Sequence, residues 1–132
     1  MSNNWIIAVV LAASSFFALG GLWYTVLFGK MWRAEMGITD EQMEGTSPMV
    51  MQFVWSILVS LVIAFTLSKL IGEAGTEYGC KVGAGTGAGI GAAILAQNYV
   101  YESRTPRFFA INAAYVVVGL AIMGTIIGVI QG

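Results

Sequence analysis

Histidine is absent from this 132-residue chain, cysteine occurs once, as Cys80, and charged residues make up only 10%. Without histidine and with a single thiol, an internal disulfide, most zinc and haem sites and most pairs of nucleophile and base are excluded. The net charge is −1, and no cluster of Lys and Arg indicates binding to nucleic acid or to anionic lipid. We therefore expect no enzyme, no metal site and no cofactor.

Apolar residues dominate instead and make up 58% of the chain. Because about 25% of the residues of a soluble domain are usually charged, a deficit this large is typical of a membrane protein. A helix of roughly 20 apolar residues crosses the hydrocarbon layer of a bilayer. We expect an all-α integral membrane protein, one transmembrane domain over 1–132, with four spans at about 5–28, 48–71, 82–101 and 108–130.

Local signals agree with these spans. Ser47 and Thr105 each precede a proline, which places a capping residue before a proline at the first helical position. Gly72 and Gly75 follow the second span and are typical of a helix end. The segment Thr39-Asp40-Glu41-Gln42 fits a capping box and predicts a short interfacial helix near 40–44, between the first and second spans.

The charges in the connections predict the orientation. The first and third connections carry four basic residues, whereas the second carries two: Lys30, Arg33, Arg104 and Arg107 against Lys69 and Lys81. Basic residues are enriched in cytoplasmic loops, so we expect the first and third connections in the cytoplasm and both termini outside.

Glycine stands at every second position from Gly83 to Gly91, within the third span. Small residues allow membrane helices to approach closely, and a helical projection places these glycines on two opposed faces. We expect this helix to be enclosed by other helices, in a symmetric homo-oligomer or inside one four-helix bundle. The packing glycines are Gly83, Gly85, Gly87, Gly89, Gly91, Gly124 and Gly128. No glycine stands at position 90, so the series does not fit a dinucleotide-binding motif.

No Asp, Glu, Lys or Arg lies in the middle of a span. Proton-coupled transporters need an ionisable group at that depth, which argues against this class and against the small multidrug exporters. Polar and aromatic residues gather instead at one end of the predicted bundle and form a candidate binding cluster: Trp23, Tyr24, Trp32, Asn98, Glu102, Arg104, Asn112 and Tyr115. The alternative is an aromatic belt with interfacial ion pairs from Glu102 to Arg104 or Arg107.

Two weaker patterns concern sulfur. Methionine is dense from Met31 to Met51, and thioethers bind Cu(I), but methionine more often fills gaps in packing. Cys80 lies at a predicted membrane edge, where it is either a palmitoylation site or a small interfacial residue.

Residues at the helix ends resemble those of a known family. They are Trp23-Tyr24, Leu27-Phe28-Gly29-Lys30, Trp32, Glu102, Arg104, Ile111-Asn112 and Tyr115. Over nearly its whole length the chain resembles the small bacterial and archaeal membrane proteins catalogued as domain of unknown function 1761. The resemblance implies a four-helix fold in a prokaryotic inner (plasma) membrane. It implies no activity, substrate or catalytic residue.

Two functions remain open at this point. The first is an oligomeric passive channel or facilitator, or a small-molecule-binding membrane protein, with the polar cluster at its mouth. The second is a structural or accessory subunit of a larger membrane complex. In both cases the partners are the lipid bilayer and other membrane helices.

Overall fold

The structure is a computed structural model and describes residues 4–23, 27, 49–102 and 105–132. Throughout these residues the elements are helical, which confirms the all-α expectation for this part of the chain. They are α1 (Asn4–Leu22), α4 (Met49–Ile71), α5 (Thr76–Thr86), the π-helix η2 (Gly87–Ala92), α6 (Ala93–Glu102) and α7 (Pro106–Gln131). The predicted interfacial helix near 40–44 lies outside the described residues.

Three helices are long and apolar enough to cross a membrane: α1, α7 and the part of α4 from Phe53 to Ile71. This agrees with the membrane class that the composition predicts. The helices α5, η2 and α6 follow one another directly, but each is shorter than a membrane crossing. The predicted third span, at about 82–101, is therefore not confirmed.

A tight turn joins α4 to α5. Gly72 and Gly75 have φ angles of 58° and 101°, which glycine adopts without strain. The helix after this turn begins at Thr76, before the predicted start of the third span at about residue 82. Its first turn is polar, with Glu77 near the positive end of the helix dipole and an ion pair of 3.1 Å between Glu77 and Lys81.

The start of α7 has the cap that its Thr-Pro sequence predicts. The Oγ1 atom of Thr105 accepts a hydrogen bond of 3.1 Å from the backbone N–H of Phe108. Pro106 occupies the first turn, where its missing N–H costs nothing.

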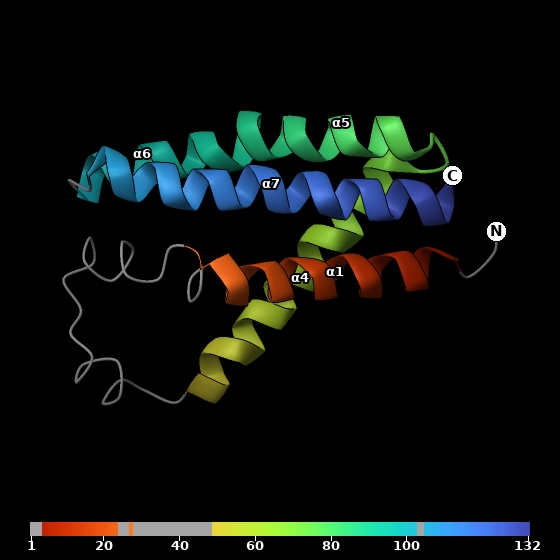
Figure 1. The fold of residues 1–132 in the computed structure, drawn as a ribbon, viewed down its shortest axis with the longest axis horizontal. Helices are drawn as coiled ribbons and strands as arrows, with labels where there is room; N and C mark the ends of the chain where they lie inside the picture. Colours follow the sequence, from red (N-terminus) through yellow and green to blue (C-terminus); the bar gives the residue numbers. More distant parts are fainter. Residues whose placement is uncertain (1–3, 24–26, 28–48, 103–104) are drawn as a thin grey trace.

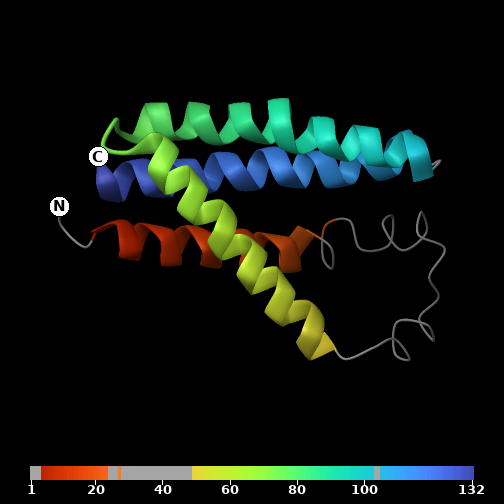
Figure 2. The same ribbon diagram turned by 180° about the vertical axis from the view of Figure 1, so that it is seen from behind.

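α7 lies between α1 on one side and the run α5–η2–α6 on the other, and α4 crosses this layer obliquely (Figures 1 and 2). The core lies where α1, α4 and α7 meet. It contains Ala8, Val9, Ala12, Ala13, Phe16, Ala64, Leu67, Ile71, Leu120, Met123 and Ile127.

α4 runs antiparallel to α1. The ring of Trp5 lies 6.1 Å from that of Phe65, and the ring of Phe17 lies 5.9 Å from that of Phe53. Towards its N-terminus α4 diverges from the other helices, as Figure 2 shows. This part of α4 exposes large apolar side chains: Phe53, Val54, Trp55, Ile57, Leu58, Val59 and Val62.

The run α5–η2–α6 contacts α7 through glycine. Gly79 and Gly83 are buried, and a Cβ atom added at either would collide with the backbone of Gly124 or Leu120 on α7. A Cβ atom at Gly87 would lie 3.0 Å from the Cα atom of Val117. The backbones of the two helices therefore approach as closely as glycine allows.

The opposite face of this run is uncovered by the residues that the structure describes. Among them, no atom lies within 4 Å of a Cβ atom added at Gly85 or Gly89, and both residues are exposed. The expected enclosure by other helices is thus present on the α7 side only.

Both chain termini and the α4–α5 turn lie at one end of the molecule, and the α6–α7 junction lies at the other (Figure 1). The end of α1 points towards the α6–α7 junction. The described part of the predicted polar cluster therefore lies at the end opposite the termini.

Candidate functional site

The structure separates the predicted polar cluster into two groups. Tyr24, Trp32 and Arg104 lie outside the described residues. Of the others, Trp23, Asn112 and Tyr115 form an inner group in the contacts between helices, whereas Asn98 and Glu102 form an outer group on the exposed face of α6. The inner and outer groups have different surroundings.

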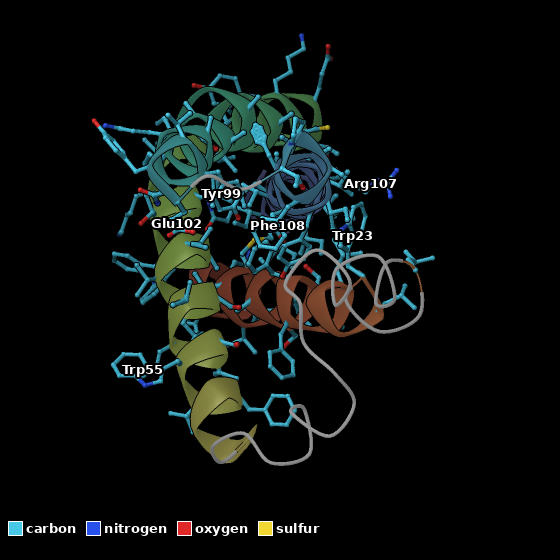
Figure 3. All side chains as sticks on the ribbon, turned by 90° about the vertical axis from the view of Figure 1, so that its left-hand side faces the viewer. Trp23, Trp55, Tyr99, Glu102, Arg107 and Phe108 are labelled. Atoms are coloured by element: carbon cyan, nitrogen blue, oxygen red, sulfur yellow. The ribbon has the colours of Figure 1, made fainter. Side chains whose placement is uncertain are left out.

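Asn112 joins α7 to α6. Its side chain is buried, and its Nδ2 atom donates a hydrogen bond of 2.8 Å to the hydroxyl of Tyr99. The ring of Tyr99 packs against Phe108 and Phe109, at centroid distances of 5.0 and 6.1 Å. Figure 3 shows Tyr99 and Phe108 directed towards each other between the two helices. The amide is thus satisfied inside the chain.

Tyr99 was not predicted from the sequence. Each step of four residues turns a position by about 40° in an α-helix, so an uninterrupted helix would put Tyr99 about 160° from Gly83. The π-helix η2 (Gly87–Ala92) lies between the two residues and has more residues per turn, which changes this phase. The contact of Tyr99 with α7 therefore depends on a local distortion that the sequence pattern did not reveal.

Tyr115 and Trp23 join α7 to α1. The hydroxyl of Tyr115 donates a hydrogen bond of 2.8 Å to the carbonyl oxygen of Phe16, and the two rings stack at 4.7 Å. The indole N–H of Trp23 donates a hydrogen bond of 3.0 Å to the carbonyl oxygen of Ile111. A Cβ atom at Gly20 would lie 2.8 Å from the Tyr115 hydroxyl, so the missing side chain leaves room for it.

The outer group has a different position. Asn98 and Glu102 are exposed and four residues apart on α6, so they share a face. Figure 3 shows Glu102 and Arg107 on opposite sides of the α6–α7 end. The inner group can act in helix packing, and the outer group can contact whatever covers α6.

Sulfur and metal ligands give no further site in the part of the chain that the structure describes. There, no group of three or more Cys, Asp or Glu residues is placed to hold a metal ion. Cys80 is a free, exposed thiol. The side chains from Met31 to Met51 lie outside the description.

The comparison with family models decides the family. A model described as a protein of unknown function (DUF1761) matches residues 7–128. The chain belongs to the DUF1761 family. No curated protein matches it, and no solved structure matches it. The resemblance seen in the helix-end residues is confirmed.

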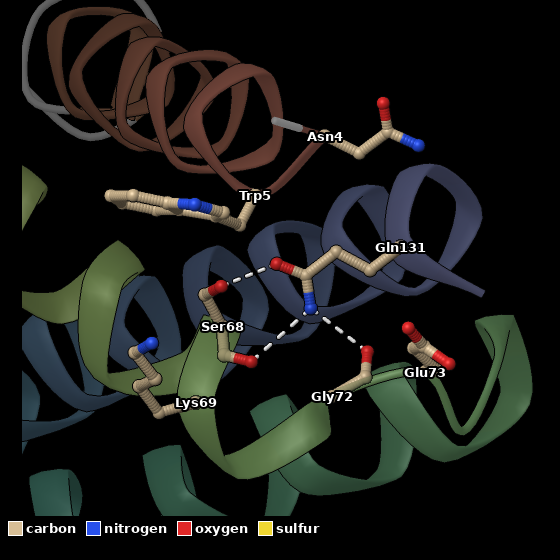
Figure 4. Close-up of a pocket in the computed structure, with 7 residues that line it drawn as sticks. All are labelled: Asn4, Trp5, Ser68, Lys69, Gly72, Glu73 and Gln131. Atoms are coloured by element: carbon tan, nitrogen blue, oxygen red, sulfur yellow. Dashed lines mark hydrogen bonds between the residues drawn. The ribbon is translucent and has the colours of Figure 1, made fainter. Parts of the chain in front are cut away.

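A second polar group in this DUF1761 chain lies at the opposite end, where the termini meet the α4–α5 turn. The side-chain amide of Gln131 accepts a hydrogen bond from the hydroxyl of Ser68 through Oε1. Its Nε2 atom donates to the carbonyl oxygens of Ser68 and Gly72, at 3.2 and 2.8 Å. The end of α7 is thus bonded to the end of α4 (Figure 4). The sequence analysis did not identify Gln131.

Proposed function

We propose that the chain is a four-span integral membrane protein in which the run from Thr76 to Glu102 makes the remaining crossing. Its length supports this, because 11, 6 and 10 residues give 27 in continuous succession. At about 1.5 Å per residue this exceeds the roughly 30 Å of a hydrocarbon core. The charges of Glu77, Lys81 and Glu102 stand near its ends, with none from 82 to 101.

We further propose that the protein works as a homo-oligomer held together by the outer face of this run. The observation that carries the proposal is that the run α5–η2–α6 has glycine on two opposite faces, of which only one is packed against α7. On the α7 side, glycines allow direct backbone contact, while no atom of the described part of the chain lies within 4 Å of a Cβ added at the outer glycines Gly85 and Gly89. Small residues in a membrane helix favour close approach of another helix, so the outer face fits a second copy.

The role of this assembly is a passive channel or facilitator. Asn98 and Glu102 support it, because they are exposed on α6, beyond the outer glycines along the same run. In an assembly of copies they would lie near the contact and could line a polar path. The proposal includes no catalytic step and no cofactor, since the chain lacks histidine and has one thiol.

A structural or accessory subunit is the second candidate. It is favoured by the N-terminal half of α4, which leaves the bundle and exposes Phe53, Trp55 and Leu58. An uncovered apolar helix face of this kind fits a foreign membrane helix as well as lipid. The inner polar residues support this candidate too, since Asn112 and Tyr115 are engaged in helix contacts.

Purification in a mild detergent separates the two candidates. A discrete homo-oligomer, measured by light scattering after gel filtration, is expected for the facilitator, and stoichiometric foreign chains for the accessory subunit. A monomer without partners would contradict both. For the facilitator, small-solute flux into liposomes should fall in the Asn98→Leu and Glu102→Ala variants, and unchanged flux would count against it.

The proposal also includes the orientation of the chain in the membrane. With the first and third connections in the cytoplasm, the α6–α7 junction faces inwards and the termini face out. Labelling of Cys80 by an impermeant maleimide in intact cells tests this. Cys80 is exposed on α5, at the end that holds the termini, so labelling from outside is expected.

A further inference from the structure

A shallow pocket lies at the end of the molecule that holds both termini. It has a volume of about 200 Å³ and is lined by residues from the start of α1, the end of α4 and the end of α7. The lining residues are Asn4, Trp5, Ser68, Lys69, Gly72, Glu73 and Gln131. These are the ends of the three helices that are long and apolar enough to cross a membrane. The pocket therefore lies at the depth of the lipid headgroups.

The floor of the pocket is fixed by internal hydrogen bonds. Gln131 uses its amide nitrogen on the carbonyl oxygens of Ser68 and Gly72 and accepts from the Ser68 hydroxyl. These bonds hold the amide in one orientation, so Gln131 shapes the pocket. The charged side chains at its rim remain for a ligand.

The rim carries one cation and one carboxylate. Lys69 extends over two aromatic rings, with its Nζ atom 5.6 Å from the centroid of Trp5 and 5.4 Å from that of Phe65. Glu73 follows the turn at Gly72, where the positive φ angle takes the chain out of the helix. In Figure 4, Lys69 and Trp5 stand on one side of the pocket and Glu73 and the Gln131 amide on the other.

We propose that this pocket binds the headgroup of a phosphatidylethanolamine lipid. The headgroup has an anionic phosphodiester next to a primary ammonium group, so the Lys69 ammonium can donate to the phosphate and the Glu73 carboxylate can accept from the amine. The exposed apolar side chains of Phe65 and Leu70 lie beside the pocket on α4, where the acyl chains can pack.

Two other headgroups fit less well. The quaternary ammonium of phosphatidylcholine has no N–H to donate, and it binds best over aromatic faces, which Lys69 already covers at Trp5 and Phe65. Phosphatidylglycerol has no cation to pair with Glu73, and its charge is repelled by that carboxylate. The chemistry of the rim thus favours a lipid that carries both charges and a primary amine.

This inference needs α1, α4 and α7 to span a membrane, but it does not depend on self-association. It can be tested by native mass spectrometry of the full chain in detergent. In the first competition, dioleoyl-phosphatidylethanolamine and dioleoyl-phosphatidylcholine are added together in equal amounts. In two further samples, each of these lipids competes with an equal amount of dioleoyl-phosphatidylglycerol. The same spectra give the number of copies, so failure of lipid binding and failure of oligomerisation are distinguishable.

We expect the ethanolamine lipid to be bound about fivefold more than the choline lipid, the scale of one net hydrogen bond, because both headgroups carry a cation and only the ethanolamine ammonium can donate an N–H to Glu73. Glu73→Gln should abolish this preference, and Lys69→Met should lower binding of both lipids. The matched control is the double variant Glu77→Gln, Lys81→Met, which removes a lysine–glutamate pair at the same end and should keep the preference. Circular dichroism of each variant checks that it folds.

Equal binding of the two lipids by the unchanged protein would overturn the proposal, as would stronger binding of the glycerol lipid. A preference that survives Glu73→Gln would overturn it too. Free phosphoethanolamine supplies the last test. If it displaces the lipid at comparable concentration, the occupant is a small soluble zwitterion, and the assignment to a lipid is wrong.

Discussion

The Nε2 atom of Gln131 lies 2.8 Å from the carbonyl oxygen of Gly72, so a side chain at the end of α7 caps the end of α4. The last four carbonyl groups of a helix have no partner within it. At a membrane boundary, water supplies such partners less readily than it does in solution. Gln131 gives a partner to the carbonyl oxygen of Gly72, just past the end of α4, and a second partner to that of Ser68, which also accepts the backbone N–H of Gly72. The side chain thereby fixes the two helix ends together.

The first prediction concerns this cap. Gln131→Leu should lower the free energy of unfolding by about 2 kcal/mol, because the Gly72 carbonyl oxygen and the Ser68 hydroxyl lose their partner, while the Ser68 carbonyl oxygen keeps the Gly72 N–H. The measurement is the unfolding midpoint in a titration of the detergent-solubilised protein with sodium dodecyl sulfate. The matched control is Gln97→Leu, at an exposed position of α6, which should leave the midpoint in place. Equal effects of the two variants would contradict the role of the cap.

The glycine contact between α5 and α7 gives the second prediction. Gly83→Ala should destabilise the fold by about 1–3 kcal/mol, because the new methyl group meets the backbone of Leu120. In the folded monomer, Gly85→Ala should be neutral or stabilise by up to about 1 kcal/mol, since alanine is the better helix former and no atom of the described residues lies within 4 Å of the added Cβ. The stabilities of the two variants are compared by thermal unfolding, monitored by circular dichroism. A loss at Gly85 equal to that at Gly83 would be inconsistent with the observed packing.

The third prediction is that substitution of the two asparagines in the predicted cluster changes the stability of the protein by different amounts. Asn112→Leu removes a buried hydrogen bond to Tyr99 and should cost about 1–2 kcal/mol of stability. Asn98→Leu changes an exposed position and should leave unfolding unchanged while lowering flux. If only Asn98→Leu lowered the stability, the assignment of Asn112 to the inner group and of Asn98 to the outer group would be wrong.

The fourth prediction compares how much the hydroxyl groups of two tyrosines contribute to stability. Tyr115→Phe keeps the stacked ring but removes the hydroxyl that donates to Phe16, which should cost about 1 kcal/mol. Tyr101→Phe is the control, because Tyr101 is 82% exposed. Unfolding midpoints of the two variants, measured side by side, give the comparison. An unchanged midpoint for Tyr115→Phe would show that the hydroxyl adds no stability beyond that of the stacked ring.

The sequence predicted those features that depend on composition and on neighbouring residues. Long apolar runs identified the helices, and the Thr105-Pro106 pair marked the start of α7 because a cap needs only local residue types. The start of α5 was not found. Hydropathy places a span by its apolar part, whereas the helix begins earlier, in the polar turn at Glu77.

Contacts between distant residues could not be predicted in the same way. Asn98 and Asn112 look alike in the sequence, and only the rotation of α6 and α7 about their axes makes one exposed and the other buried. Gln131 is a single polar residue at a chain end, so its bond to the end of α4 depends on how three helices cross. One residue type in isolation does not determine such an arrangement.

The central claim is that the outer glycine face of the run α5–η2–α6 joins copies of the protein. The most direct measurement is the molar mass of the detergent-solubilised protein by light scattering, for the unchanged chain and for Gly85→Leu, Gly89→Leu. We expect a discrete oligomer that becomes a folded monomer in the double variant, because leucine fills the outer face, where a Cβ atom has no described atom of the same chain within 4 Å. Ala18→Leu, at an exposed position of α1, should remain an oligomer. An unchanged chain that is monomeric, or a double variant that keeps its full oligomeric mass, would contradict the claim.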